Sequence, residues 1–360
     1  MLYHLLYPLH QTYIIFNVFK YITFRSAGAA LTALLASVIF APFVIKRLKK
    51  LKITQGIREN IPGSQVKEST PTMGGVFILS AIIISTLLWA DLTNRFVQLI
   101  LFVTIWLGAL GFLDDYLKIK RRGPHGLSPM YKLIGQLLLA AGIGCYLYSS
   151  PLVQEYATKL SIPFFKKILP NLGWFYIPFV ILVIVGSSNA VNLTDGLDGL
   201  AIGSLLIAGA TYALLAYLTG HSQFSEYLGI IHLAGSGELA IFLAGLVGAC
   251  LGFLWFNAYP AQVIMGDTGS LALGGVLGTV AVLIKKELLL VIVGGVFVLE
   301  ALSVGIQVMS FKLRGKRVFK MAPIHHHFQL LGWAEPKIIV RLWIVGLMFA
   351  LLSLMTLKLR

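Results

Sequence analysis

The sequence predicts an all-α integral membrane protein, with about ten transmembrane helices in a single polytopic domain covering residues 1–360. Hydrophobic residues form 58% of the chain, charged residues form only 12%, and the mean hydropathy is +0.85. Ordinary globular domains carry about 25% charged residues. Several apolar runs are long enough to cross about 30 Å of hydrocarbon as helices. The alternating pattern of a membrane barrel strand is missing, so helices must satisfy the backbone groups in lipid.

The chain begins with a segment, residues 1–20, that is rich in Tyr and Phe. It lacks a basic region followed by a small-residue cleavage site, so we expect an interfacial amphipathic helix rather than a cleaved signal peptide. The apolar runs that follow predict membrane spans at roughly 22–45, 73–90, 96–113, 131–149, 175–191, 199–219, 238–256, 270–284, 288–311 and 338–357.

The distribution of positive charge predicts how these spans are oriented. Ten spans put both termini on one side, and alternate gaps then face alternate sides. Of the 29 Lys and Arg residues, 19 fall in the gaps 46–72, 114–132, 192–198, 257–269 and 312–341. Positive charge favours the cytoplasm, so these gaps are predicted to be cytoplasmic and both termini to lie outside. Lys159, Lys166 and Lys167 run against this asymmetry.

The net charge of +15 raises the question of a nucleic-acid partner. In a membrane protein, cationic residues set topology and meet anionic lipid headgroups, so we predict no nucleic acid. Cys145 and Cys250 both lie inside apolar runs and are interpreted as packing residues rather than a disulfide or a metal site.

Five of the six aspartates fall in the predicted cytoplasmic gaps, and only Asp91 falls outside them. Asp114 and Asp115 stand in "GFLDDYLKIKRR", where the span is predicted to end near Leu113. A helix C-terminus disfavours carboxylates, so capping does not explain the pair. A bound cation or a proton-accepting role would explain it; the alternative is that Lys118 and nearby arginines simply neutralise the acids.

Two further stretches place acids where a helix is predicted to begin. Asp195 and Asp198 in "VNLTDGLDGLA" precede a span that starts near Gly199, so they are either helix caps or part of a site. Asp267 in "MGDTGSLALGG" stands before the next such span. There, with Thr268 and Ser270, it is either a cap or part of a glycine-lined helix start that binds an anion.

The last basic loop, 312–337, contains "MAPIHHHFQLLGW" with His325, His326 and His327. Consecutive histidines cannot all point one way. They are candidates for contacts with phosphate or for zinc binding, although no Cys or Glu shows the usual zinc spacing; the alternative is a solvated, lipid-facing loop. Lys67, before a predicted span, either binds phosphate or anchors the helix. Glu300 is an acid in mid-span, which marks either a functional site or a helix break.

Acids, bases and helix N-termini on one face together favour a divalent cation and a phosphorylated ligand. Mg²⁺ uses one or two carboxylates and shares substrate phosphates. We therefore predict phosphoryl chemistry at the inner membrane surface.

The stretches "TPTMGG", "GFLDDYLK", "NAVNLTDGLDGLA", "GFLWFNAYPAQVIMGDTGSLALGG" and "APIHHHF" occur in this order. Over nearly the whole chain they closely resemble the polyprenyl-phosphate sugar-1-phosphate transferase superfamily. The triple-histidine loop resembles its phospho-N-acetylmuramoyl-pentapeptide transferase family in particular.

This resemblance implies a ten-helix enzyme of the bacterial inner membrane, usually a homodimer, with both termini periplasmic and the active site facing the cytoplasm. It implies Mg²⁺-dependent transfer of phospho-MurNAc-pentapeptide from UDP-MurNAc-pentapeptide to undecaprenyl phosphate, giving lipid I and UMP. That step belongs to peptidoglycan synthesis, on which the cell wall, cell shape and cell division depend.

The resemblance also implies roles for individual residues. Asp114 matches the acid proposed to take the proton of the lipid phosphate, and Asp267 matches the metal ligand. The implied catalytic set is Asp114, Asp115, Asp267 and His325. The implied substrate-binding set, in which 192–198 holds the uridine end, is Lys67, Lys118, Lys132, Asn192, Asp195, Asp198, Asn257, His326 and His327. Ile264 departs from the pattern, because an aromatic residue is expected there under the uracil ring.

Two alternatives remain open on the sequence. One is a sibling enzyme that uses another UDP-N-acetylhexosamine, against which the histidine loop argues. The other is a membrane transporter, which predicts acids buried at mid-membrane, where only Glu300 is expected.

Overall fold

The computed structural model describes residues 1–50, 70–121, 126–149, 156–165 and 168–358. In this part of the chain every regular element is a helix, and the one β feature is an isolated bridge between Lys159 and Asn171. The predicted all-α class is therefore confirmed for the described residues.

Among the described residues, ten apolar helices correspond to the ten predicted spans. Nine of them are long and apolar enough to cross a membrane, and α12 is the one that corresponds to the ninth predicted span. The tenth, α3, is a shorter apolar helix. Their bounds are α2 Ile22–Lys50, α3 Gly75–Trp89, α4 Arg95–Lys120, α5 Pro129–Ser149, α6 Tyr176–Thr194, α7 Leu200–Gly220, α9 Glu238–Asn257, α10 Gly266–Leu283, α12 Gly295–Arg314 and α14 Glu335–Met355.

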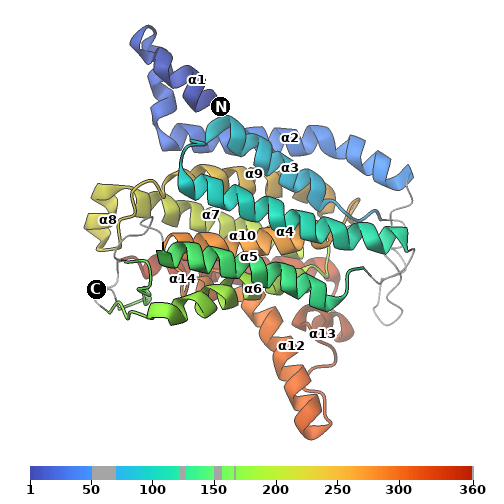
Figure 1. Ribbon diagram of the computed structural model, residues 1–360. Helices are drawn as coiled ribbons and strands as arrows, with labels where there is room; N and C mark the ends of the chain where they lie inside the picture. The colour runs from blue at the N-terminus through green and yellow to red at the C-terminus, as the bar shows by residue number, and fades with distance from the viewer. Residues whose placement is uncertain (51–69, 122–125, 150–155, 166–167, 359–360) are drawn as a thin grey trace.

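The shorter elements lie at the ends and between the long helices. Their bounds are α1 Leu2–Leu6, η1 Tyr7–Gln11, η2 Ile14–Lys20, η5 Gly173–Phe175, α8 Ser222–Leu228, α11 Leu290–Val293 and α13 Ile324–Leu330. The first three replace the single amphipathic helix expected over 1–20, and Figure 1 shows that they project beyond the bundle. They expose large apolar side chains such as Leu5, Ile14 and Ile15, so the interfacial role of this segment stays a prediction.

Helix α10 is the centre of the bundle. Every residue from Thr268 to Leu283 is buried, and the helix packs against α4 and α6 and also touches α3 and α7. Its run of small residues and aliphatic side chains is apolar all round, which is what a helix surrounded by other helices requires. Figure 1 shows α10 between neighbours that run side by side with it.

Two predicted boundaries are wrong in ways that matter for function. The span expected to end near Leu113 continues as α4 to Lys120, so Asp114 and Asp115 lie inside a helix rather than at its C-terminus. The span expected over 288–311 is divided at Gly294 into the short helix α11 and the long helix α12.

Helix α12 has an arrangement of its own. It leans away from the other helices, and α13 lies near it at the same end of the bundle (Figure 1). Few of its residues are buried, and Glu300 is one of them. Because α12 is continuous through Glu300, the interpretation of this acid as a helix break is wrong.

Candidate active site

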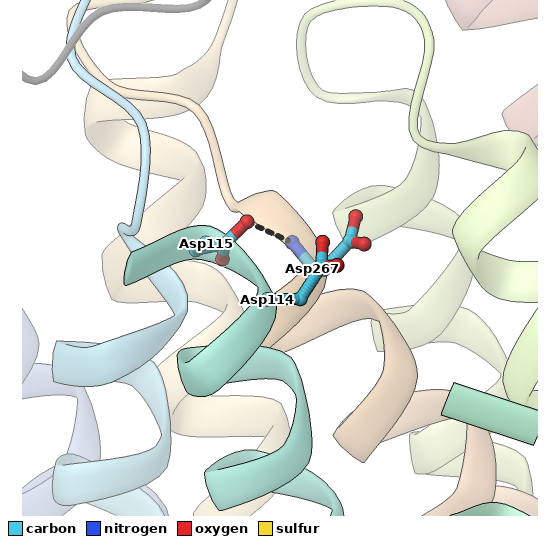
Figure 2. A group of neighbouring side chains, drawn as sticks. All are labelled: Asp114, Asp115 and Asp267. Carbon is cyan, nitrogen blue, oxygen red and sulfur yellow. Dashed lines mark hydrogen bonds between the residues drawn. The ribbon is translucent and has the colours of Figure 1, made fainter. Parts of the chain in front are cut away.

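Three carboxylates from two distant segments meet at one end of α10. Asp114 and Asp115 come from α4, and Asp267 comes from the first turn of α10. One ligand atom from each lies within 4.8 Å of the others. Figure 2 shows the three side chains lying together. Of the five aspartates predicted to converge, Asp114, Asp115 and Asp267 therefore do so, whereas Asp195 and Asp198 are not part of this group.

Asp115 caps α10 from the neighbouring helix. Its Oδ2 accepts hydrogen bonds from the Thr268 backbone N–H at 2.9 Å and from the Thr268 hydroxyl at 2.7 Å. Its Oδ1 accepts the Asp267 N–H at 3.3 Å, the dashed line in Figure 2. A carboxylate is stabilised at the positive end of a helix, so this contact fixes the start of α10 against α4.

The interpretation of Asp267, Thr268 and Ser270 as caps of their own helix is thus wrong. Helix α10 starts at Gly266, and no side chain of its N-cap residue accepts a hydrogen bond. Ser270 instead donates its hydroxyl to the Gly266 carbonyl. Because Asp115 supplies the cap, Asp267 can turn its carboxylate toward Asp114.

Two glycines make this close helix contact possible. A Cβ added at Gly111 of α4 would overlap the Asp267 backbone carbonyl, and one at Gly75 would overlap the Gly269 backbone nitrogen. Only glycine lets backbones approach so closely. "TPTMGG" is held beside α10 by further bonds, because Gly74 N–H donates to the Ile264 carbonyl and Ile264 N–H donates to the Pro71 carbonyl.

Two lysines cover the carboxylates. Lys118, one turn after Asp114, places Nζ 2.5 Å from Asp114 Oδ2 and 3.2 Å from Asp267 Oδ2. Lys132, in the first turn of α5, places Nζ 2.8 Å from Asp267 Oδ2 and 3.3 Å from Asp114 Oδ1. The proposal that Lys118 neutralises the acids is thus right in part, but two ammonium groups face three carboxylates. We call these five residues the carboxylate cluster.

One part of the carboxylate cluster is buried, and another part reaches solvent. Asp114 and Asp115 are 0% and 2% exposed, whereas the side chains of Lys118, Lys132 and Asp267 are 33%, 24% and 16% exposed. Asn192, at the end of α6, donates from Nδ2 to Asp267 Oδ1 at 3.0 Å and to Ser270 Oγ at 2.8 Å. The Asp267 carboxylate is therefore held in place by side chains from three other helices, α4, α5 and α6.

The donor set fits a hard divalent cation. Mg²⁺ prefers oxygen ligands and is commonly held by one or two carboxylates together with water and substrate phosphates. Asp267 and Asp114 have such oxygens and an excess of negative charge around them, while Asp115 is engaged by the first turn of α10. Among the described residues the histidines form no comparable group of metal ligands, so nothing supports the zinc alternative.

A second group of predicted residues braces the loops beside this cluster. Asp198 Oδ2 accepts the Ala261 N–H at 3.0 Å. Asn257 accepts the Gly199 N–H at 3.0 Å and donates to the Val263 carbonyl at 2.8 Å. These bonds tie the turn after α6 to the segment before α10. Asp195 is the half-buried residue that ends α6.

The interpretation of Asp195 and Asp198 as caps of α7 is wrong. The N-cap is Gly199, in the left-handed region with a φ of +84°, and no side-chain cap is formed. A glycine tolerates this backbone conformation, which a side chain would strain. Both aspartates are thus left in the turn 195–198, which we call the aspartate turn.

The three histidines point to three different partners, as expected of consecutive side chains. His325 Nδ1 lies 3.0 Å from Glu300 Oε2, and both residues are fully buried. His326 Nδ1 lies 2.7 Å from Gln329 Oε1, and His327 Nδ1 accepts the Lys320 N–H at 3.1 Å. The ring of His325 reaches the aspartate turn at Gly196. Lys67 lies outside the described residues.

Sequence reasoning missed two contacts of this site. Thr268 was considered only as a cap of its own helix, and Glu300 had no predicted partner. The isolated acid in an apolar run was a usable signal for Glu300, because such a charge needs a partner nearby. The identity of that partner depends on how α13 packs on α12.

Comparison with known proteins agrees with this geometry. The model of glycosyl transferase family 4 matches residues 97–285, and signature 1 of phospho-N-acetylmuramoyl-pentapeptide-transferase matches residues 67–79. The chain is 58% identical to the phospho-N-acetylmuramoyl-pentapeptide-transferases of Citrifermentans bemidjiense and of Geobacter sp. strain M21, over the full length of each chain. It is 54% identical to the protein of that name from Syntrophus aciditrophicus, again over full length.

The family-model match covers more than half of the chain and contains all three carboxylates, and the relatives are similar from end to end. The chain therefore belongs to the phospho-N-acetylmuramoyl-pentapeptide-transferase family, within glycosyl transferase family 4.

Proposed function

We propose that this protein transfers phospho-MurNAc-pentapeptide from UDP-MurNAc-pentapeptide to undecaprenyl phosphate, releasing UMP and forming lipid I for peptidoglycan synthesis. The observation that carries the proposal is the carboxylate cluster, in which Asp114, Asp115 and Asp267 meet Lys118 and Lys132. Phosphoryl transfer needs this combination, because catalysis of that reaction consists mainly of positioning and of charge stabilisation.

We place the carboxylate cluster at the cytoplasmic face of the bacterial inner membrane, with both termini periplasmic. Of the 29 Lys and Arg residues, 19 fall in the gaps that the sequence predicts on one side, and the gap 114–132 includes four of the five residues of the cluster, which supports that orientation. A soluble nucleotide sugar arrives from the cytoplasm, and a lipid phosphate lies at the inner leaflet. A site at this interface reaches both substrates.

Helix N-termini add to the attraction for phosphate. Helices α3 and α10 begin side by side at the cluster, α5 supplies Lys132 from its first turn, and α7 begins at the aspartate turn. The N-terminal end of a helix favours an anion. We therefore assign the aspartate turn with Asn192 and Asn257 to the uridine end, and Lys118 and Lys132 to the phosphates.

Asp267, with Asp114 beside it, would hold Mg²⁺, which when bound supplies positive charge against the repulsion of two phosphorylated substrates. Asp115 holds the start of α10 and thereby the position of Asp267.

In the proposed reaction Asp114 accepts the proton of the lipid phosphate. The freed phosphate oxygen attacks the phosphorus that carries MurNAc, and the bond from that phosphorus to its bridging oxygen breaks, so UMP leaves. Asp114 is buried beneath Lys118 and Lys132, so these lysines must turn toward the substrate phosphates before the proton can move. A covalent aspartyl-phosphate intermediate is the competing mechanism.

The test uses purified full-length protein with Mg²⁺ and both substrates. We expect release of UMP that requires undecaprenyl phosphate and the pentapeptide. UDP-MurNAc without the pentapeptide should give no product, and turnover with UDP-N-acetylglucosamine would identify a sibling enzyme instead. Folded protein that releases no UMP under these conditions would overturn the proposal. Light scattering in detergent would test the homodimer that we also propose.

A further inference from the structure

A buried hydrogen-bonded pair outside the carboxylate cluster links two elements near the aspartate turn. Glu300 of α12 and His325 of α13 are each 0% exposed, with 3.0 Å between Oε2 and Nδ1. A carboxylate can only accept a hydrogen bond, so Nδ1 carries the hydrogen. The contact therefore fixes the orientation of the ring and leaves Nε2 as the nitrogen that faces away from Glu300.

The far side of the imidazole ring packs against Gly196. A Cβ added at Gly196 would overlap Nε2, and the three nearest atoms to that Cβ all belong to the ring of His325. Nε2 is buried and has no hydrogen-bonding partner among the described residues. In this arrangement the ring is covered by the turn, so it supports the backbone of Gly196 and is not presented to a reacting atom.

The aspartate turn is held on its other side by hydrogen bonds. Asp198 Oδ2 accepts the Ala261 N–H at 3.0 Å, and the Asp198 N–H donates to Glu335 Oε1 at 3.0 Å. The turn also follows directly from Asn192, whose amide contacts Asp267. A shift of His325 would therefore move the turn relative to the carboxylate cluster.

We propose that Glu300 and His325 are positioning residues: Glu300 orients the imidazole, and the imidazole supports the aspartate turn that binds the nucleotide end of the substrate. The proposal rests on the proposed function, which assigns this turn to the uridine end. It gives His325 a role in nucleotide binding rather than in the transfer step.

The first test compares Glu300→Ala with Glu300→Gln in the full-length protein. The glutamine keeps an oxygen that can accept from Nδ1, whereas alanine releases the ring. We expect Glu300→Ala to raise the KM for UDP-MurNAc-pentapeptide and the Kd for UMP about tenfold, with kcat changed far less. Glu300→Gln should stay close to the wild type in all three constants.

The second test introduces the missing Cβ. Gly196→Ala should weaken UMP binding in the wild type, because the methyl group meets the ring and displaces the turn. In a His325→Ala background the same change should add little, because the ring is absent. Gly186→Ala on α6 is the control, since a Cβ there would meet no described atom within 4 Å apart from its chain neighbours and the backbone of its own helix.

Two results would overturn the proposal. One is a fall in kcat for Glu300→Ala with unchanged affinity for UMP, which would make His325 part of the chemical step. The other is an equal effect of Gly196→Ala with and without the ring. Thermal midpoints in detergent identify variants that do not fold. If Glu300→Ala does not fold, the comparison of Gly196→Ala in the wild type and in the His325→Ala background tests the proposal instead. Wild-type protein that neither binds nor releases UMP would contradict the proposed function instead.

Discussion

Helix α10 carries a buried group of charges at each end, and the two groups differ in kind. The carboxylate cluster lies at its N-terminus. Beyond its C-terminus, about 27 Å away at 1.5 Å per residue, lies a second group that we call the Lys285 cluster: Lys285, Glu287 and Tyr176. Lys285 Nζ lies 3.3 Å from Glu287 Oε1 and donates to the Tyr176 hydroxyl at 2.7 Å.

The Lys285 cluster is closed to solvent, and its three side chains bond one another. One ammonium group faces one carboxylate, the Tyr176 hydroxyl donates to Glu287 Oε1 at 2.6 Å, and Lys285 also donates to the Ala157 carbonyl at 3.1 Å. The side chains of Lys285 and Glu287 are 1% and 0% exposed. The carboxylate cluster has two ammonium groups for three carboxylates, and its lysines and Asp267 reach solvent.

This difference separates a structural ion pair from a candidate site. Buried charges that neutralise one another hold elements together, whereas an open group with excess charge can bind a charged ligand. Removing a carboxylate should therefore mainly lower activity at the carboxylate cluster and mainly lower stability at the Lys285 cluster.

The largest expected effect is on activity at the carboxylate cluster. Asp267→Asn should lower kcat about 10³-fold or more, because it removes charge where the substrate phosphates and the cation meet. The thermal midpoint measured without Mg²⁺ should change little, since Asn192 can still bond the new side chain. Lys285→Met with Glu287→Leu is the comparison, and it should leave kcat near the wild-type value. Activity in Asp267→Asn close to that of the wild type would remove this acid from the mechanism.

The next effect is on stability at the Lys285 cluster. Glu287→Ala leaves Lys285 buried without its carboxylate, which should cost about 3 kcal/mol. The double variant Lys285→Met with Glu287→Leu removes both charges and should be close to neutral. Thermal unfolding in detergent measures both, and a double variant as unstable as the single one would show that the pair itself stabilises the fold.

Cation binding should distinguish the two ends without any turnover. Mg²⁺ should stabilise the wild-type protein by about 2.7 kcal/mol when free Mg²⁺ exceeds its Kd a hundredfold. Asp267→Asn should lose this gain, and Glu287→Ala should keep it. The readout is the midpoint of thermal unfolding with Mg²⁺ or with EDTA. Equal stabilisation of all three proteins would place the cation elsewhere.

A smaller effect is expected where Asp115 caps α10. Thr268→Val keeps the shape of the side chain but removes the hydroxyl that donates to Asp115 at 2.7 Å, a change that should cost about 1.5 kcal/mol. Because the Thr268 backbone bond remains, kcat should fall only moderately. A loss of activity as large as that of Asp267→Asn would mean that Asp115 takes part in the reaction directly.

The smallest effect concerns pH. Burial lowers the pKa of Lys285, and Glu287 offsets this in part. The unfolded chain therefore binds more protons in the interval between the folded and unfolded pKa values, so this group's contribution to stability rises with pH through that interval. The thermal midpoint of the wild type, relative to the double variant Lys285→Met with Glu287→Leu, should improve as the pH rises toward the ordinary lysine pKa of about 10.4. A constant difference would show that Lys285 titrates as it does in water.

Much of the fold was predictable because its signals are local. Length and hydropathy gave the ten apolar helices, and the aspartates Asp114, Asp115 and Asp267 were correctly expected to converge. Helix ends were less predictable. The apolar run stops near Leu113, yet α4 continues to Lys120, because Asp115 and Lys118 find partners on α10 that a sequence pattern does not contain.

The sequence by itself determined the class of protein and the number of apolar helices, because both depend on side chains close together along the chain. Only the tertiary structure decided that Asp115 caps α10, that Lys132 covers Asp267 and that Glu300 holds His325. The physical reason is that these contacts join segments far apart in the sequence, and they form only where Gly75, Gly111 and Gly196 let the elements approach.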